Sequence, residues 1–459
     1  MMHLTCEASD LSSTNGFMRY QCLLVLLLFA ASGVPTLYAQ AQTLSAAADP
    51  GSAKLAEDIR ADQSLDQVHK LAQDLLKTGL NAGSGYSEVW IRDLNTFIEI
   101  ALEVNPPARL KEALVNFLKF QGPTGDIVDG YVRVDAATVK YAYRMSPLAP
   151  ELMAHKNTVE TDQESSLIQA ITKYVEITGD RTILDERVDG MTVRERLGHA
   201  LEYVLTERFD AKHGLVWGAT RADWGDIQPE SAWGVVVDAN SHPAFCIYDN
   251  AMFLIAINDY LQLIGPNATG AGRWRSIRNR LKHNIRKTLW DEKNQKFIPH
   301  VYIKGSPFPK DFDENAIYYH GGTAVAIEAG LLSPAEIRKS LDHMVADTHA
   351  AGAASIGLTM YPPYPAGFFK NSGMAPYNYQ NGGDWSWFGG RMVRELIKRG
   401  DVEDAYRELR PMTERVQRTG GFHEWWTPDN QPRGSDQFRG SAGVLGRDIE
   451  LLQEWAKQH

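Results

Sequence analysis

Two short segments contain the residue types that acid–base chemistry needs. In the first, Asp223 and Asp226 lie on either side of Trp224, in a stretch without helical periodicity. A carboxyl group packed against indole rings loses solvation, so its pKa rises and it stays protonated at neutral pH. We interpret Asp223 as the candidate general acid and Asp226 as the alternative acid, because a protonated carboxyl can donate to a leaving oxygen. A surface ion pair between Arg221 and either Asp is the structural alternative.

The second segment contains Glu424, which lies between His423 and Trp425. A charged side chain is unusual among neighbours that favour burial. An ionised Glu in such a place can draw a proton from water, and we interpret Glu424 as a candidate general base. A structural ion pair with Arg433 or Arg439 is the alternative.

An earlier segment, Trp90-Ile91-Arg92-Asp93, places an aromatic ring, a cation and an anion at the start of an expected helix. Flat rings beside charged groups are typical of sugar-binding sites, because a sugar presents both an apolar ring face and hydroxyls. We therefore expect Trp90 to pack against a sugar ring and Arg92 and Asp93 to hydrogen-bond its hydroxyls. N-capping of the helix by Asp93 is the structural alternative.

The segment 157–164 is rich in acids. Glu160 and Glu164 are four residues apart and share one face once a helix has begun. A capping box, with Thr161 as the cap and Glu164 as its partner, explains the pattern without any catalysis. We expect Glu160 and Asp162 to bind substrate instead of performing the chemistry.

Other kinds of catalysis lack their characteristic patterns. The histidines are scattered, and the sequence has no His-x-Glu-x-x-His pattern, no cysteine-rich cluster and no Asp-x-Asp-x-Asp loop, so we expect no metal. Gly-x-Ser-x-Gly and phosphate-binding glycine loops are absent as well. We expect no cofactor.

Helical periodicity dominates the chain, since apolar residues recur every three or four positions in about twelve stretches. Strand-like stretches are few and short, at 234–237 and 297–302. Tight turns alternate with long loops rich in glycine and aromatic residues, so we expect the long loops to gather on one rim. The pattern predicts an all-α fold, an (α/α)6 barrel; a helical solenoid, the alternative, needs a sequence repeat that is absent. The expected helices are 55–80, 93–104, 107–120, 161–178, 193–206, 249–264, 271–289, 321–331, 334–348, 384–399, 402–417 and 441–457.

The N-terminal region has the pattern of a signal peptide. An apolar run at 23–31 is followed by small residues before Ala41, and Met18-Arg19 supplies a basic start, so Met18 is the expected initiator. We expect residues 1–40 to be cleaved, 41–54 to form a polar leader and 55–459 to form one catalytic domain. The mature protein is then exported, periplasmic or secreted, with no membrane partner. It keeps Cys246 as its one cysteine and therefore has no intrachain disulfide.

The net charge of −10 comes with no evident basic stripe, so nucleic acid is not an expected partner. The 11 Trp, 18 Tyr and 16 Phe instead favour a carbohydrate partner. The sequence gives no prediction of oligomeric state.

In the order of its motifs, the chain resembles the six-hairpin glycosidases, and among them the neutral/alkaline invertases and the related trehalase and glucosidase-I group. The Ile-Arg-Asp motif of those proteins appears at Ile91–Asp93, and their acid maps to Asp223. Their Thr-Gly-Gly-x-Trp-Pro-Trp motif appears within Gln380–Trp387, and their Trp-Pro-Glu-Tyr-Tyr motif appears as Phe422–Trp426. The invertase acid is followed by basic residues and Met-Gly, which this chain lacks, so Asp226 stays open as the acid.

The resemblance implies an inverting, exo-acting hydrolase that removes a terminal, α-linked hexosyl residue of glucosyl type. Asp223 would protonate the glycosidic oxygen while Glu424 activates water, with the two carboxyls about 6.5 to 9.5 Å apart. The further substrate-binding candidates from these segments are Arg221, Trp224, Asn381, Asp384, Trp385, Trp387, His423, Trp425 and Trp426.

Two other functions remain alternatives. A sugar epimerase or isomerase on the same barrel would need two histidines in its pocket, and His423 with His242 or His320 are the available ones. A non-catalytic glycan-binding protein would keep the aromatic residues without needing Asp223 and Glu424 to oppose each other.

Overall fold

The computed structural model describes residues 50–459, which form one compact unit. The expected signal peptide and most of the polar leader lie outside the described residues. The end of that leader, residues 50–54, is helical and opens α1 (Pro50–Ala61). The expected helix 55–80 is therefore two helices, because the chain turns at Asp62, which caps α2 (Gln63–Thr78) by accepting from the Ser64 N–H at 3.0 Å.

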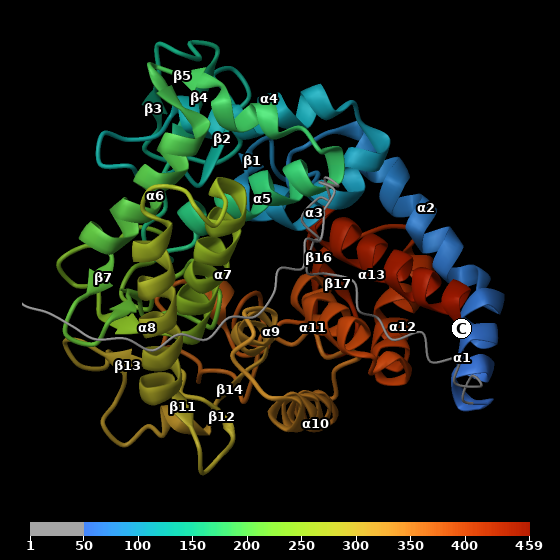
Figure 1. The fold of residues 1–459 in the computed structure, drawn as a ribbon. Coiled ribbons are helices and arrows are strands. Elements are labelled where there is room, and N and C mark those ends of the chain that lie inside the picture. Colours follow the sequence, from blue (N-terminus) through green and yellow to red (C-terminus); the bar gives the residue numbers. More distant parts are fainter. Residues whose placement is uncertain (1–49) are drawn as a thin grey trace, which may run out of the picture. The chain divides into compact units, whose positions relative to one another are not determined.

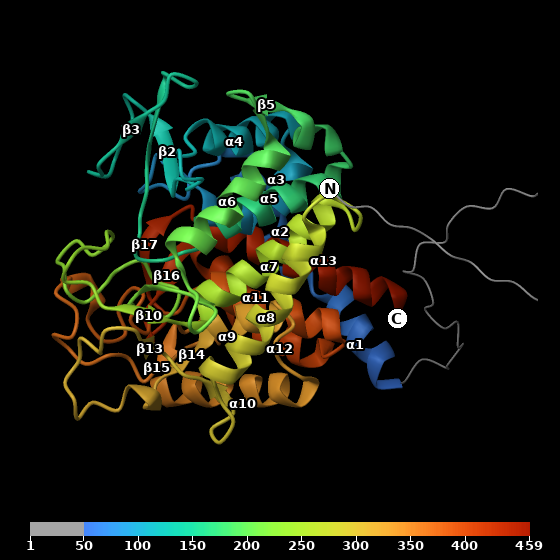
Figure 2. The same ribbon diagram turned by 60° about the vertical axis from the view of Figure 1, so that its left-hand side comes forward.

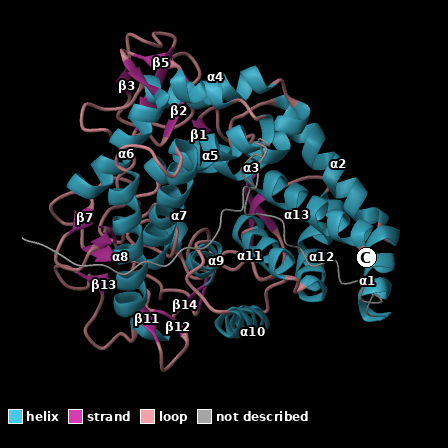
Figure 3. Ribbon diagram, in the orientation of Figure 1, coloured by secondary structure: helices cyan, strands magenta, loops and turns pink. Residues whose placement is uncertain are grey.

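Six helices form a closed inner ring. Each contacts the next one in the ring, and α13 returns to contact α3 (Figures 1 and 3). The inner helices are α3 (Ile91–Val104), α5 (Gln163–Thr178), α7 (Ile247–Ile264), α9 (His320–Glu328), α11 (Ser386–Arg399) and α13 (Arg439–Gln458).

An outer helix precedes each inner helix along the chain and packs against the ring. The outer helices are α2, α4 (Pro107–Lys119), α6 (Val193–Glu207), α8 (Ala271–Leu289), α10 (Pro334–Ala351) and α12 (Val402–Thr419). Six hairpins with their inner members in a closed ring make an (α/α)6 barrel, which confirms the expected all-α fold class.

The burial pattern explains which helices are inner. In α11, every residue from Ser386 to Ile397 is buried, whereas α12 buries Val402, Ala405, Leu409 and Met412 at helical spacing on one side. A helix that buries its whole circumference has to lie inside, and one with a single apolar stripe covers it from outside.

The short strands lie almost entirely in the connections between helices. Figure 2 shows most of them gathered with the long loops on one side of the barrel, away from the C-terminus. One sheet has the order β1 (Val89–Trp90), β2 (Gly130–Arg133), β4 (Leu152–His155), β3 (Arg144–Met145), and another β13 (Val301–Tyr302), β10 (Pro243–Phe245), β9 (Gly218–Ala219). The remaining pairs are β5 (Arg187–Val188) with β6 (Met191–Thr192), β7 (Phe209–Asp210) with β8 (Leu215–Val216), β11 (Trp290–Asp291) with β12 (Lys296–Phe297), β14 (Tyr318–Tyr319) with β15 (Met360–Tyr361), and β16 (His423–Trp426) with β17 (Pro432–Asp436).

The strand expected at 234–237 does not form, since this segment is loop. Its backbone bonds to other loops instead: the Val235 carbonyl accepts from Thr158 and the Gly234 carbonyl accepts from Gln228, both at 3.0 Å. The expected strand 297–302 is divided between β12 and β13.

The charge pattern differs from the expectation at α8. This outer helix carries seven Lys and Arg side chains and no Asp or Glu, so a basic helix does exist in this acidic chain. The absence of a nucleic-acid partner stays a prediction. Within residues 50–459, the helices are all too short or too polar to cross a membrane.

Candidate active site

A cavity opens where the inner helices begin. It encloses about 450 Å³ of empty space, its mouth included. Its walls come from the residues just before or at the N-termini of α3, α5, α11 and α13, together with three loops. The lining residues are Trp90, Arg92, Asp93, Asp129, Tyr141, Asn157, Glu160, Trp224, Asp226, Tyr379, Gln380, Trp385, Trp387, Glu424 and Phe438.

Glu424 reaches this cavity from β16 and is held from two sides. Its Oε2 accepts the Ser435 N–H across the β16–β17 hairpin at 2.7 Å, and its Oε1 accepts the Tyr86 hydroxyl at 3.1 Å. Burial, with a smaller contribution from the Asp226 charge, raises the pKa of Glu424 to about 7 against the opposing effect of these two hydrogen bonds. The carboxyl therefore changes its charge near neutral pH.

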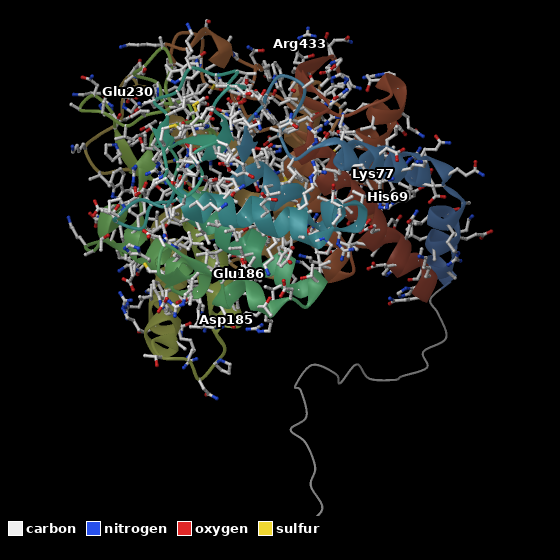
Figure 4. The ribbon with its side chains drawn as sticks, turned by 90° about the horizontal axis from the view of Figure 1, so that it is seen from above. His69, Lys77, Asp185, Glu186, Glu230 and Arg433 are labelled. Carbon is white, nitrogen blue, oxygen red and sulfur yellow. The ribbon has the colours of Figure 1, made fainter. Side chains whose placement is uncertain are left out.

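The ion pair expected as the alternative role of Glu424 does not form. Arg439 donates to the Asn81 carbonyl at 2.8 Å and to the Thr78 hydroxyl at 2.7 Å, and Arg433 donates to the Pro432 carbonyl at 2.9 Å. Figure 4 shows Arg433 at the periphery, on the side of the molecule opposite Asp185 and Glu186.

The two candidate acids occupy different environments. Asp226 lines the cavity, where its Oδ1 accepts the Gln380 side-chain amide at 2.7 Å. Asp223 is completely buried outside the lining, and both its carboxyl oxygens accept the Gly322 N–H, at 2.9 and 3.1 Å. Burial raises the pKa of Asp223 to about 7. The Asp223 carboxyl binds its own loop to the start of α9. Of the two candidate acids, Asp226 is therefore the one that lines the same cavity as Glu424.

The surface ion pair expected for Arg221 is absent as well. Arg221 is fully buried and pairs with Asp249 at 2.7 Å, and neither residue lines the cavity. The neighbouring Trp224 does line the cavity, and its ring stacks on Phe388 of α11 with centroids 4.3 Å apart.

Arg92 is the one cation in the cavity lining, and acids already surround it. Its Nε is 2.8 Å from an oxygen of Asp162, and its Nη2 is 3.1 Å from an oxygen of Glu160. Asp162 also accepts the Tyr248 hydroxyl at 2.7 Å and does not line the cavity. Arg92, Glu160 and Asp162, all candidates from the sequence, are therefore in contact, and a ligand in the cavity can reach Arg92 and Glu160.

Two capping roles expected near the cavity are not observed. Trp90 is the N-cap of α3, so Asp93 lies in the first turn, where burial raises its pKa well above the usual range. At α5 the N-cap is Asp162, the Thr161 hydroxyl donates to the Trp217 carbonyl, and Glu164 accepts from the Ile127 N–H at 2.9 Å. The capping-box interpretation is therefore wrong, because Glu164 turns toward the neighbouring loop.

Six buried polar atoms of the lining have no partner in the protein. They are the indole Nε1 of Trp90, Trp224 and Trp387, and the oxygens Asp93 Oδ1, Asn157 Oδ1 and Glu160 Oε2. Buried polar atoms are normally hydrogen-bonded, and an unpaired one is destabilising by about 1 to 3 kcal/mol. Donors and acceptors mixed in this way match a ligand with several hydroxyls.

Several candidates from the sequence lie outside the cavity lining and contact other groups of the protein. Asn381 accepts the Tyr364 N–H at 2.8 Å, and Asp384 pairs with buried Arg415 at 2.8 Å. Trp426 is buried under the Arg415 guanidinium, and Trp425 is buried against Tyr379. None of these side chains belongs to the lining, which includes Trp385 and Trp387 from the same region. His423, His242 and His320 also lie outside it.

Six further residues line the cavity that were not among the candidates from the sequence, namely Asp129, Tyr141, Asn157, Tyr379, Gln380 and Phe438. Asp129 accepts the Asn157 amide at 2.6 Å, and burial raises its pKa to about 7. The dipeptide Asp129-Gly130 is typical of a turn, so the neighbouring residues offered no reason to expect a buried carboxyl.

A candidate cation site lies elsewhere. Within residues 50–459, the one cluster with suitable spacing is His69, Glu103 and Glu450, on α2, α3 and α13. The His69 imidazole donates to the Glu450 carboxylate at 3.0 Å, and none of the three side chains lines the cavity.

The fold defined by these helices is the six-hairpin (α/α)6 barrel of known glycoside hydrolases. The GH63 mannosylglycerate hydrolase of Thermus thermophilus, solved in complex with glucose, superposes with a TM-score of 0.59 at 15% identity, covering 83% of this chain and 99% of that one. A rhamnosidase from Klebsiella oxytoca with rhamnose bound gives 0.54 at 14% identity, covering 84% of this chain and 63% of that one.

A GH78 rhamnosidase from a Bacillus species gives a TM-score of 0.55 at 14% identity, covering 84% of this chain and 34% of that one. No protein-family profile and no curated sequence matches the chain. The similarity is therefore one of fold, and the function has to be argued from the cavity itself.

Proposed function

We propose that the protein is an inverting glycoside hydrolase in which Asp226 is the general acid and Glu424 the general base. The observation that carries this proposal is that both carboxyls line one aromatic cavity whose unpaired polar atoms match sugar hydroxyls. Hydrolysis with inversion needs two carboxyls and a bound sugar between them. The known hydrolases of the same fold support it.

In the proposed reaction, Asp226 gives its proton to the glycosidic oxygen as the bond to the anomeric carbon breaks. A water molecule attacks that carbon on the opposite ring face, and Glu424 takes the proton that the water loses. The products are a free sugar of inverted configuration and the leaving alcohol. Exchange with solvent returns Asp226 to its protonated form and Glu424 to its ionised form.

The charges of the cavity favour a neutral sugar. Five acids line it, namely Asp93, Asp129, Glu160, Asp226 and Glu424. The one cation, Arg92, already has two acidic partners. An acidic substrate group would find no free cation, so we propose a neutral, terminal, α-linked hexosyl residue of glucosyl type as the substrate.

A sugar isomerase receives less support, because that chemistry would use two histidines and the cavity lining contains none. Export to the periplasm or the medium stays a proposal that rests on residues 1–40. N-terminal sequencing of the protein recovered from cell fractions tests it, and a retained N-terminus would contradict it.

The test of function is hydrolysis of a panel of α- and β-linked disaccharides, aryl glycosides and glycosyl fluorides by the wild type and by Glu424→Gln, Asp226→Asn and Asp223→Asn. We expect Glu424→Gln to lose activity on every substrate. Asp226→Asn should keep activity on glycosyl fluorides, because fluoride leaves without a proton donor. Proton NMR of the first product should show inversion.

Each other outcome has a definite meaning. If Asp223→Asn, and not Asp226→Asn, loses activity on disaccharides while keeping it on glycosyl fluorides, the general acid is Asp223. Full activity of Glu424→Gln would end the two-carboxylate mechanism. Sugar binding without any hydrolysis would make the protein a glycan-binding one.

A further inference from the structure

An exposed tryptophan lies on the loop that follows the proposed acid. Trp233 is 51% exposed, and among the described residues it is the one aromatic side chain with such large exposure. An exposed indole offers a large, flat apolar surface on which a ring can stack.

Hydrogen bonds hold this loop in place. The Gln228 N–H donates to the Gly234 carbonyl at 3.0 Å, next to Trp233 in the chain. The Thr158 N–H donates to the Val235 carbonyl at 3.0 Å, and the Val237 N–H donates to the Thr158 hydroxyl at 2.8 Å. Thr158 follows Asn157 of the cavity wall, so the backbone of the loop that carries Trp233 is fixed relative to the cavity.

Trp233 continues an aromatic surface that starts in the cavity. Its ring meets Tyr141 edge-on with centroids 5.8 Å apart, and Tyr141 lines the cavity. Tyr141 is itself stacked on His155 with centroids 3.7 Å apart. The aromatic side chains therefore lead from the cavity wall to solvent without an interruption.

This surface lies on the side of the proposed acid. Tyr141 and Asp226 line the same cavity. The loop that carries Trp233 continues from Asp226, and the Gln228 N–H, two residues after Asp226, donates to the Gly234 carbonyl at 3.0 Å. In glycoside hydrolysis the general acid stands next to the oxygen of the leaving group. A leaving group protonated by Asp226 would thus extend past Tyr141.

We propose that Tyr141 and Trp233 form the binding surface for the leaving group, and that this group contains a ring, either a second sugar or an aryl group. The inference rests on the proposed function, and it adds the class of leaving group. A flat ring can stack on the exposed indole, which a small chain such as glycerate or methanol cannot do.

The test compares phenyl and methyl α-D-glucopyranosides and α-D-mannopyranosides, which share a sugar and differ in the leaving group. Their dissociation constants are measured by calorimetry on Asp226→Asn, so that no turnover occurs, with and without Trp233→Ala. Ile177→Ala is the control, because Ile177 is 49% exposed near the C-terminal end of α5, away from the cavity.

We expect the phenyl glycosides to bind Asp226→Asn more tightly than the methyl glycosides, by about threefold to tenfold for one stacked ring. Trp233→Ala should remove this difference and leave the methyl glycosides unchanged, while Ile177→Ala changes neither. Equal weakening of both glycosides, unchanged binding, or no binding of the phenyl glycosides overturns the assignment. Because this readout is binding, a protein that binds through Trp233 yet hydrolyses nothing would contradict the proposed function alone.

Discussion

The side chain of Gln380 makes two hydrogen bonds to Asp226. Its amide donates to the Asp226 carboxylate at 2.7 Å, and its carbonyl accepts the Asp226 N–H at 3.2 Å. One side chain therefore fixes both the backbone and the carboxyl of the proposed acid from a loop 154 positions further along the chain.

Gln380→Ala should release Asp226 and lower kcat about tenfold to a hundredfold, because a misplaced acid transfers its proton less efficiently. The loss should be large for disaccharides and small for glycosyl fluorides, which do not need the acid. Gln431→Ala, an exposed change in the β16–β17 turn, is the control. A loss of the same size on both substrate types would show that Gln380 acts on something other than the acid.

Gly434→Ala should displace Glu424. Gly434 has φ +69°, and a Cβ there would overlap the Glu424 carboxylate. Gly420→Ala is the matched control, since Gly420 has φ +72° and open space around the added Cβ. Both variants should lose about 1 kcal/mol of stability through the left-handed backbone. Only Gly434→Ala should lose most of its activity; equal activities in the two variants would contradict the clash.

Tyr86→Phe should move the pH dependence of activity. The Tyr86 hydroxyl stabilises ionised Glu424, whose pKa is about 7. The base works when ionised, so kcat/KM should rise as the pH rises through this pKa. Removing the hydroxyl raises the pKa, and the acidic limb of the kcat/KM profile should shift to higher pH. An unmoved limb would mean that another group controls it.

Glu424→Gln should stabilise the protein at alkaline pH. The folded-state pKa of about 7 lies above the ordinary value of 4.5, so between these values the folded state binds more protons than the unfolded state. The contribution of Glu424 to stability is therefore lost as the pH rises through this window. Urea unfolding should show Glu424→Gln more stable than the wild type at pH 8, by about 1 to 3 kcal/mol, and close to it at pH 4.

Asp384→Asn should lower the free energy of unfolding and leave sugar binding by the folded protein unchanged. Asp384 and Arg415 are both fully buried and 2.8 Å apart. Removing one charge leaves the other buried without a partner, which is destabilising by about 3 to 5 kcal/mol. Thermal unfolding measures the loss, and Asp135→Asn, in an exposed pair with Arg133, should change little. A stable Asp384→Asn with weakened sugar binding would restore Asp384 as a binding residue.

The sequence by itself determined the helices and the class of fold. Apolar periodicity placed most inner and outer helices within a few residues, because a helix that must bury one face or its whole circumference repeats its apolar residues every three or four positions. The sequence also indicated seven residues of the cavity lining, because acids and tryptophans are close neighbours in the segments that contain them. These residues are Trp90, Arg92, Glu160, Trp224, Trp385, Trp387 and Glu424.

Only the tertiary structure decided which side chains share the cavity. Asp223 and Asp226 look alike in the sequence, yet the left-handed backbone at Asp223, φ +50°, goes with a carboxyl bound to α9, while Gln380 holds Asp226 in the cavity wall. Asp129 and Tyr141 line the cavity although their neighbours in the sequence do not indicate it. In an irregular loop the direction of a side chain depends on partners far away in the sequence, and a pattern of neighbouring residues does not contain them.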